Sequence, residues 1–511
     1  MILDIIAIIS FFAAYILSVV RFMHIFQLNS YAAPTQIRWM RNNRSKWLVN
    51  VFMAAAALLG ALFSALPVTI AALLWGAYLE RPQKAKKPLV YTKRVRRMLV
   101  TEAVITAAVI AAAAFLGGIK SALISMICLY LVSPVLEIAA NFINKPIEKS
   151  VNNHFISEAK KILGKCPELR IIGVTGSYGK TSVKYYLNTL LRAKYNVLMT
   201  PESYNTPMGV VMTIRQHLRA THEIFICEMG AKKVGEIKEI CDIVHPHDGV
   251  ITSIGPQHLE TFKSLENVKK TKFELADALP KDGLLFLNGD DENIASYNKN
   301  KSAITYSMKN GDYTAFDISV SEKGTKFSVK APNGDIGSFA TKLIGAHNVL
   351  NITGAIAIAH TYGVSMTELK PQVRKLECVP HRLQLIDKGS ALVIDDAYNS
   401  NPSGTKAALD TLKLITGFRI LVTPGMVELG EKQDECNREF GQNAAEVCDY
   451  VVLVGKKQTE SIRQGLADKN YPDDKIFVAD NIGEAIAKAY GINSKEMKKI
   501  ILLENDLPDN Y

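Results

Sequence analysis

The distribution of apolar residues divides the 511-residue chain into two unlike parts. Up to about residue 150 the apolar runs are long and nearly free of charge, namely 2–20, 47–78, 98–118 and 119–142. Beyond about residue 160, short apolar runs alternate with helical patterns. Long uncharged runs are typical of membrane spans, and short alternating runs are typical of α/β domains. We therefore expect N-terminal transmembrane helices followed by soluble α/β structure.

The run from Trp47 to Tyr78 is the least regular of the apolar segments. As one helix the run would be ~48 Å long, which is too long for a ~30 Å hydrocarbon core. It is slightly too short to form two full spans. We predict a tight helical hairpin that turns near Pro67, and a second hairpin that turns at Gly117-Gly118. The result is a transmembrane region over residues 1–150 with about five spans. Three or four spans, or buried helices of a soluble protein, are the alternatives.

The charge of the chain, formally +11, is concentrated in this first part. Residues 1–150 contain 16 Lys and Arg against 5 Asp and Glu, and the remainder contains 44 of each. The basic residues lie mainly in the loops 21–46 and 80–97, which is typical of cytoplasmic loops. We expect a multi-pass protein of a cytoplasmic membrane, with the lipid bilayer as a partner and the domains after Phe142 in the cytoplasm.

The neutral remainder excludes two classes of protein. It has no basic face of the kind that binds nucleic acid. Its scattered cysteines include no C-x-x-C pair, so neither a zinc site nor a disulfide framework is indicated. Reduced thiols in the cytoplasm fit this distribution.

Short strand-like runs predict two α/β domains. In the central domain, residues 160–377, they lie at 223–228, 249–254 and 284–287, and we expect a mostly parallel sheet. Residues 301–342 read as short strands joined by Gly-containing turns, an excursion at the rim of that domain. In the C-terminal domain, residues 378–511, five further runs predict a Rossmann-like sheet without a dinucleotide-binding fingerprint: 391–394, 419–422, 450–454, 475–478 and 499–503.

A phosphate-binding loop is the most specific motif of the chain. The segment Thr175-Gly-Ser-Tyr-Gly-Lys-Thr-Ser182 stands between an apolar strand and a helical pattern. Backbone N–H groups of such a loop and of the following helix bind an anion, Lys180 reaches the β- and γ-phosphates, and the Thr181 hydroxyl ligates Mg²⁺. The strict pattern has glycine at position 174, where this chain has Val174. An ordinary strand–loop–helix is the weaker alternative.

Two polar residues follow neighbouring strand-like runs. Glu228 ends one run, and His258 comes shortly after the next. Because functional groups of open α/β sheets gather at the carboxyl ends of the strands, both are candidate ligands or outer partners of Mg²⁺. Without further context, a helix-capping Glu228 and a surface His258 are the more ordinary interpretations.

The ordered set of motifs resembles the Mur ligase family over roughly residues 165–490. The segments that carry the resemblance are Thr175–Ser182, Thr200-Pro-Glu-Ser-Tyr-Asn205, Glu228-Met-Gly-Ala231, His258-Leu-Glu260 with Lys272, Asn288-Gly-Asp-Asp291, Gly345-Ala-His-Asn-Val-Leu-Asn351, Arg382, and Asp395-Asp-Ala-Tyr-Asn-Ser-Asn-Pro402. The Thr-Pro-x-x-x-Asn and Asp-Asp-Ala-Tyr-Asn-x-Asn-Pro forms among them most resemble the branch that adds D-alanyl-D-alanine.

The resemblance implies an ADP-forming, ATP-dependent amide ligase of peptidoglycan precursor synthesis. It would work through an acyl phosphate and join D-alanyl-D-alanine, or another amine acceptor, to a muramoyl-peptide-type carboxylate. ATP and Mg²⁺ are the implied cofactors, and other cell-wall precursor enzymes are implied partners. Lys180, Lys272 and His258 would be catalytic, and Lys272 matches a lysine that many members carbamylate.

Further roles are carried over from the family residue by residue. The implied nucleotide contacts are Thr175, Gly176, Ser177, Gly179, Lys180, Thr181, Ser182, Asn288, His347, Asn348, Arg382 and Asp396. The implied metal ligands are Thr181, Glu228, His258 and Lys272, and the implied substrate contacts are Asn205, Thr206, Tyr398, Asn399 and Asn401.

Three departures from the family pattern leave the substrates open. The membrane region replaces the domain that binds the UDP-sugar, His381 replaces the glycine usual before the arginine, and an acidic end, 502–511, replaces a basic Lys-Gly-Ser-Arg-type stretch. A lipid-linked or poly-glutamate-type carboxylate donor is therefore an alternative. A different class of function is a non-catalytic membrane scaffold that senses ATP.

Overall fold

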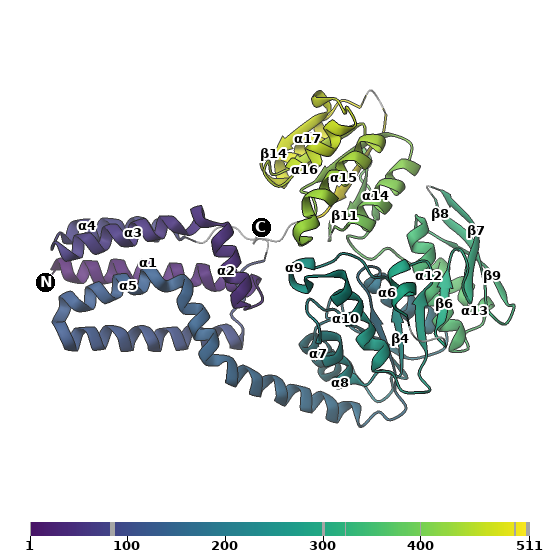
Figure 1. Ribbon diagram of the computed structural model, residues 1–511, viewed down its shortest axis with the longest axis horizontal. Helices are drawn as coiled ribbons and strands as arrows, with labels where there is room; N and C mark the ends of the chain where they lie inside the picture. The colour runs from purple at the N-terminus through teal and green to yellow at the C-terminus, as the bar shows by residue number, and fades with distance from the viewer. Residues whose placement is uncertain are drawn as a thin grey trace. The chain divides into compact units, whose positions relative to one another are not determined.

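The computed structural model contains two compact units, Met1–His154 and Phe155–Asp506. The structure describes residues 2–81, 87–298, 302–321, 323–398, 400–494 and 497–506. The first unit is helical, and the second contains two β-sheets covered by helices (Figure 1).

The first unit consists of α1 (Ile2–Leu28), α2 (Ala33–Asn42), α3 (Arg44–Leu62), α4 (Leu66–Leu79) and α5 (Lys93–Leu163). The chain breaks between α3 and α4 next to Pro67, which lies in the first turn of α4, where the apolar pattern predicts a turn. α5 is interrupted at Gly117 and at Gly118, whose φ of 69° favours glycine. The two arms of α5 thus form the second predicted hairpin. The pattern did not predict α2.

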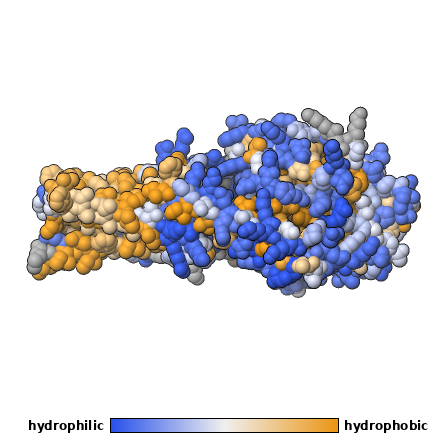
Figure 2. All heavy atoms as spheres, turned by 90° about the horizontal axis from the view of Figure 1, so that it is seen from below, coloured by the Kyte–Doolittle hydropathy of each residue, from blue (hydrophilic) through white to orange (hydrophobic). Residues whose placement is uncertain are grey.

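Apolar side chains both fill and cover this unit. Small and aromatic residues such as Ala14, Ala57 and Tyr130 pack between α1, α3, α4 and α5. Large apolar side chains, among them Phe12, Trp75 and Phe115, are exposed on the outside, and Figure 2 shows apolar surface over these helices. α1 and α5 are long and apolar enough to cross a membrane, whereas the apolar parts of α3 and α4 are shorter.

The second unit begins with a nine-stranded sheet in the order β2-β3-β1-β4-β5-β6-β7-β8-β9. The strands are β1 (Arg170–Thr175), β2 (Val197–Met199), β3 (Ile224–Glu228), β4 (Asp248–Ile251), β5 (Leu285–Asn288), β6 (Ile304–Ser307), β7 (Tyr313–Ser321), β8 (Gly324–Lys330) and β9 (Ile336–Thr341). β1 to β6 are parallel, as is the pair β6–β7, and β7, β8 and β9 pair antiparallel. The prediction of a mostly parallel sheet with a β excursion at its rim is confirmed.

Helices cover both faces of this sheet because successive strand residues point to opposite sides. Ile172 packs with α6 (Lys180–Leu191), α12 (Ala346–Thr361) and α13 (Met366–Arg374). Its neighbour Ile171 packs with α7 (Pro207–His217), α8 (Glu236–Val244) and α10 (Leu265–Asp277). The short helices α9 (Leu259–Phe262) and α11 (Glu292–Tyr297) follow β4 and β5.

The second sheet has six strands in the order β10-β11-β15-β12-β13-β14. They are β10 (Gln384–Asp387), β11 (Ala391–Asp396), β12 (Phe418–Thr423), β13 (Tyr450–Val454), β14 (Ile476–Ala479) and β15 (Lys499–Glu504). All pairs are parallel except β10–β11. One face packs against α14 (Pro402–Leu414), α15 (Gln433–Val447) and α16 (Glu460–Asp468), and the other against α17 (Ile482–Gly491). Only β10 was not predicted.

Candidate functional site

Two glycines shape the loop between β1 and α6. Gly179 has φ 79°, in the left-handed region, and a Cβ there would lie 2.8 Å from Asn351 Oδ1. A Cβ on Gly176, with φ 152°, would lie 2.1 Å from Thr252 Oγ1. Neither position accepts a side chain without movement of its neighbours, so the two glycines of the sequence motif are required by the fold.

The loop is braced by the segment that follows β4. Ser177 N donates to Ser253 O at 2.7 Å, Ser177 Oγ donates to Gly255 O at 3.1 Å, and Tyr178 N donates to Ser253 Oγ at 2.8 Å. Thr175 Oγ1 bonds in turn to Met229 O at 2.9 Å. These bonds fix the loop backbone before any ligand is bound.

Asn288, at the end of β5, supports this bracing segment. Its Nδ2 donates to Thr252 O at 2.9 Å, and its side chain is 6 % exposed. The structure therefore places Asn288 behind the loop rather than in open solvent.

Lys180 begins α6 and folds back over the loop. Its Nζ donates to Gly176 O at 2.8 Å and to Ser177 O at 3.0 Å. Burial lowers the pKa of Lys180 to about 8, while Glu228 raises the pKa and Arg382 lowers it. The ammonium group is thus held at the mouth of an N–H-lined loop, the place where an anion would bind.

Thr181 and Glu228 meet beside the loop. Thr181 Oγ1 donates to Glu228 Oε1 at 3.2 Å, and Asn205 Nδ2 donates to the same oxygen at 2.9 Å. The sequence motifs named all three residues, and the folded chain brings them together from α6, from the end of β3 and from the segment before α7.

Lys184, which the sequence analysis missed, completes this cluster. Its Nζ lies 3.0 Å from Glu228 Oε2, and the two side chains are 0 % and 1 % exposed. Burial raises the pKa of Glu228, but Lys184 and Lys180 outweigh it, so the pKa is below its usual value. Glu228 therefore stays anionic. Lys184 lies one turn after Lys180 on α6, so both side chains are on the same side of the helix.

Glu428 is the second residue that sequence reasoning missed. His258 Nδ1 lies 2.5 Å from Glu428 Oε2, and Lys232 Nζ lies 3.6 Å from Glu428 Oε1. Burial raises the pKa of Glu428, but the bond to His258 and the charge of Lys232 lower it to about 2. Burial lowers the pKa of His258 below its usual value, although Glu428 raises it. A neutral His258 donates Nδ1–H to the carboxylate and leaves Nε2 as an acceptor.

Lys272, on α10, is buried without a carboxylate at ion-pair distance among the described residues. Its side chain is 2 % exposed. Burial lowers its pKa well below the usual value, and Lys180 acts in the same direction. Lys272 is therefore not a solvated surface lysine. A neutral amine is also the form that reacts with carbon dioxide.

The start of α12 holds two further predicted nucleotide contacts. Burial lowers the pKa of His347 to about 4, so the imidazole is neutral. Asn348 accepts from Tyr186 Oη at 2.8 Å and donates to Ile344 O at 2.9 Å. The amide of Asn348 thus joins α12 to α6 in this structure, and a nucleotide contact of Asn348 stays a prediction.

Arg382 connects the phosphate loop with the second sheet electrostatically. It acts on Lys180 and on Asp396, and its guanidinium lies 4.4 Å from the ring centroid of Tyr398. The Tyr398 hydroxyl is hydrogen-bonded to Ser203 Oγ. Predicted nucleotide and acceptor contacts therefore lie close to one another.

His381 explains one departure from the family pattern. It has φ 60°, the left-handed conformation that favours glycine. Its Nδ1 lies 2.8 Å from Asp395 Oδ2, which holds the imidazole in place. The backbone feature is thus kept although the glycine is not.

Asp396 and Glu504 end two neighbouring parallel strands in register. Glu504 is 0 % exposed, and its Oε1 accepts from Ser400 Oγ at 2.8 Å. Burial raises the pKa of Asp396 to about 6, and burial together with Asp396 raises the pKa of Glu504 well above its usual value. The acidic C-terminal end thus contributes a carboxyl group to the strand edge that bears Asp396.

Three predicted substrate contacts have different positions in the structure. Thr206 caps α7 by accepting from Gly209 N, and Asn401 caps α14 by accepting from Gly404 N at 2.9 Å. Asn399 lies outside the described residues.

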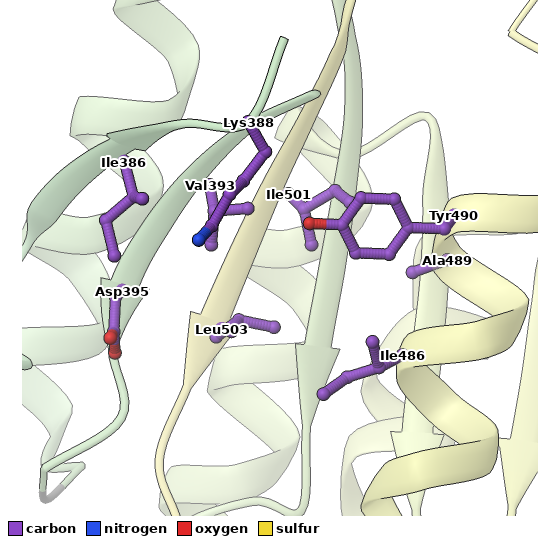
Figure 3. A pocket seen from close by; sticks show the side chains of 9 residues that line it. All are labelled: Ile386, Lys388, Val393, Asp395, Ile486, Ala489, Tyr490, Ile501 and Leu503. Atoms are coloured by element: carbon purple, nitrogen blue, oxygen red, sulfur yellow. The ribbon is translucent and has the colours of Figure 1, made fainter. Parts of the chain in front are cut away.

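Two further features concern metal binding and a pocket of the second sheet. Among the described residues, no group of three His, Cys, Asp or Glu side chains could hold a metal ion. A pocket between α17 and the strands β10, β11 and β15 is lined mainly by apolar side chains, with Asp395 at one end (Figure 3). It contains no residue of the phosphate loop.

Comparison with protein families matches two models in chain order. The Mur ligase middle domain matches residues 174–359, and the Mur ligase glutamate ligase domain matches residues 381–503. UDP-N-acetylmuramoyl-tripeptide–D-alanyl-D-alanine ligase of Escherichia coli is 32% identical over 295 residues, which are 56% of this chain and 65% of that protein. The Haemophilus influenzae enzyme of the same name is 32% identical over 334 residues, or 63% of this chain and 72% of that protein.

Solved structures agree with these matches. MurF from Acinetobacter baumannii superposes with a TM-score of 0.64 at 26% identity, covering 70% of this chain and 78% of that chain. MurF ligase from Thermotoga maritima, solved in complex with ADP, superposes with a TM-score of 0.61 at 26% identity. The match covers 70% of this chain and 80% of that chain. The chain spans slightly less than two thirds of the E. coli relative, and its N-terminal unit lies outside the matched models. With both family domains present in order, the chain belongs to the Mur ligase family.

Proposed function

We propose that the chain is a membrane-anchored, ATP-dependent amide ligase of peptidoglycan precursor synthesis. A carboxylate oxygen of the donor attacks the γ-phosphorus of ATP, the bond to the bridging oxygen breaks, and ADP leaves. The acceptor amine then attacks the acyl carbon, the bond to the phosphate oxygen breaks, and phosphate leaves as the nitrogen loses a proton. The single observation that carries the proposal is the assembly of the phosphate loop, Lys180, Thr181 and Glu228.

The phosphate end supports binding of ATP. The loop N–H groups and Lys180 offer hydrogen-bond donors and positive charge where the transferring phosphoryl group gains negative charge. Arg382 adds a further cation near Lys180. The ADP complex of the T. maritima relative supports the same assignment.

The oxygen atoms beside the loop fit a magnesium ion. Thr181 Oγ1 and Glu228 Oε1 lie 3.2 Å apart, and hydroxyl and carboxylate oxygens are ligands that Mg²⁺ accepts. Thr181 and Glu228 would hold this ion, which when bound would neutralise phosphate charge. For a second ion we propose His258, through Nε2, and Lys272. Lys272 fits only as the carbamate, because an amine is not a ligand that Mg²⁺ prefers.

The substrates follow from the family branch. We propose a muramoyl-peptide-type donor held near Asn205 and Thr206, and D-alanyl-D-alanine as the first acceptor to test, held near Tyr398, Asn399 and Asn401. A second candidate donor is lipid-linked. The exposed apolar side chains of the N-terminal unit favour this variant, because they suit a bilayer better than water.

The N-terminal unit supports a multi-pass membrane location. Its outside is apolar, whereas polar side chains such as Glu80 and Glu102 are buried. A soluble protein has the opposite distribution, with polar side chains outside and apolar side chains inside. The basic loops favour a cytoplasmic position for the catalytic unit. We propose about five spans. Resistance of the full chain to alkaline extraction from membranes tests this part, and release of the chain would contradict it.

Phosphate release by the purified full-length protein in detergent tests the activity. The assay contains ATP, Mg²⁺, a UDP-muramoyl-tripeptide donor and D-alanyl-D-alanine, with lipid-linked donors as a parallel arm. We expect phosphate release that depends on both donor and acceptor, a product mass larger by the acceptor less one water, and no activity for Lys180→Ala. Hydrolysis of ATP independent of carboxylate and amine would overturn the ligase and favour the ATP-sensing scaffold.

A further inference from the structure

The N-terminal unit buries several polar side chains, among them Asn50, Thr69 and Glu80. Six others lie on α1 and on the two arms of α5. Each is at most 6 % exposed. We call them the polar seam, and they are Tyr15 and Ser18 on α1, Glu102 and Thr106 on the first arm of α5, and Ser133 and Glu137 on its second arm.

Helical spacing brings the seam together. The members of each pair are three or four residues apart and so share one face of their helix. Tyr15 Oη lies 2.6 Å from Thr106 Oγ1, and Ser18 Oγ lies 2.8 Å from Ser133 Oγ. The polar faces of three helix segments therefore meet in the interior of the bundle.

The two carboxylates of the seam have no visible partner. All four oxygens of Glu102 and Glu137 are buried and accept no hydrogen bond from the described residues. Glu102 and Glu80 both act electrostatically on Glu137, so Glu102 and Glu137 are near enough to repel each other. Two arginines of the unit form ion pairs with other carboxylates: Arg21 pairs with Glu80 at 2.8 Å, and Arg97 pairs with Glu148 at 2.6 Å.

An apolar interior does not tolerate two uncompensated negative charges. We propose that the polar seam binds a divalent cation between Glu102 and Glu137. Two carboxylates balance two positive charges, and the hydroxyl groups of Tyr15, Thr106 and Ser18 add oxygen atoms close by. Oxygen-only ligands on flexible side chains suit Ca²⁺, which accepts six to eight oxygens in irregular geometry. The site belongs to the N-terminal unit and contains none of the residues assigned to ATP.

Binding of radioactive Ca²⁺ to the full-length protein in detergent, measured by equilibrium dialysis without nucleotide, tests the proposal. We compare the wild type with Glu102→Gln and Glu137→Gln. Glu148→Gln is the matched control, because Glu148 lies on the same helix and pairs with Arg97. We expect Glu102→Gln and Glu137→Gln each to lose one bound Ca²⁺ per chain, and Glu148→Gln to bind as the wild type does.

Thermal unfolding provides a second readout that a purely structural role would not produce. Without Ca²⁺ we expect both glutamine variants at the seam to unfold at a higher temperature than the wild type, because each removes an uncompensated charge. Added Ca²⁺ should raise the midpoint of the wild type and of Glu148→Gln and leave the seam variants unchanged. Equal Ca²⁺ binding by all four proteins, or no Ca²⁺-dependent shift in the wild type, would overturn the proposal and leave protons to neutralise the seam.

Discussion

Replacement of Lys184 by methionine tests the electrostatics of the phosphate end. The ammonium and the Glu228 carboxylate are 3.0 Å apart, and their side chains are 0 % and 1 % exposed, so water does not screen the pair. Removing one partner of a buried ion pair costs about 3–5 kcal/mol. Burial lowers the pKa of Lys184 despite the pair, which means that desolvating the ammonium already costs free energy. The substitution recovers that cost, so we expect the lower end, about 3 kcal/mol.

The assay is thermal unfolding of the full-length protein, measured by calorimetry. A loss of about 3 kcal/mol corresponds to a midpoint lower by on the order of 6 °C. Lys184→Arg keeps the positive charge, so its unfolding midpoint should fall far less than that of Lys184→Met. Lys233→Met, at an exposed lysine, is the matched control for the loss of a cation and should leave the midpoint unchanged.

The pH dependence gives the sign of the effect. The lowered pKa of Glu228 in the folded wild type contributes stability above its unfolded pKa, and this contribution is lost as the pH falls through the folded value. In Lys184→Met the pKa of Glu228 rises, so the deficit should be largest near neutral pH and shrink in acid. A variant that melts with the wild type at neutral pH would refute the reasoning, because Glu228 would then not need Lys184 to stay ionised.

Three further predictions concern the loop, the buried lysine and the strand-end carboxyl pair. Gly179→Ala places a Cβ 2.8 Å from Asn351 Oδ1 in a left-handed conformation; we expect a loss of about 1–3 kcal/mol and weaker ATP binding by calorimetry. Lys272→Ala should be inactive, and acetate should restore part of its phosphate release, because a small carboxylate replaces the carbamate; no rescue would count against the carbamate. Burial raises the pKa of Asp396 to about 6, so its protonated form favours the fold and stability falls as the pH rises from about 4 to about 6. Glu504→Gln removes the second acid of that pair. Relative to the wild type, this variant should gain about 1–3 kcal/mol more free energy of unfolding at pH 8 than at pH 5, measured by thermal unfolding.

Residues that act through the local chain could be predicted from the sequence. The phosphate loop depends on Gly176 and Gly179, and a strand before them and a helix after them complete the pattern. The strand ends at Glu228 and Asp396 follow from short apolar runs, because a buried parallel strand has a clear beginning and end. β10 escaped prediction because all its residues are at least partly exposed, so it has no continuous apolar run.

Partners that meet only in the folded chain could not be predicted in this way. Glu428 is 170 residues from His258, and no spacing rule connects them. Lys184 resembles a solvated lysine of an amphipathic helix until β3 brings Glu228 beside it. Glu102 in the first arm of α5 is a single charge within an apolar run, and the run predicts a span but not a buried polar seam.

Burial and the positive charges at the phosphate end together lower the pKa of Lys272. Arg382 acts on both Lys180 and Lys184, and Lys180 acts on Lys272, so several cations converge on the start of α6. A fully protonated set suits a triphosphate but repels itself before ATP arrives. Among the described residues, Lys184 has a carboxylate at ion-pair distance, Glu228 at 3.0 Å, whereas Lys272 has none. The pKa of Lys272 accordingly lies well below its usual value. Conversion of the Lys272 amine to a carbamate would replace a group that repels Lys180 when protonated by a negative group, which the positive charge of Lys180 stabilises. The same burial that lowers the pKa of Lys272 thus favours the carbamate proposed above.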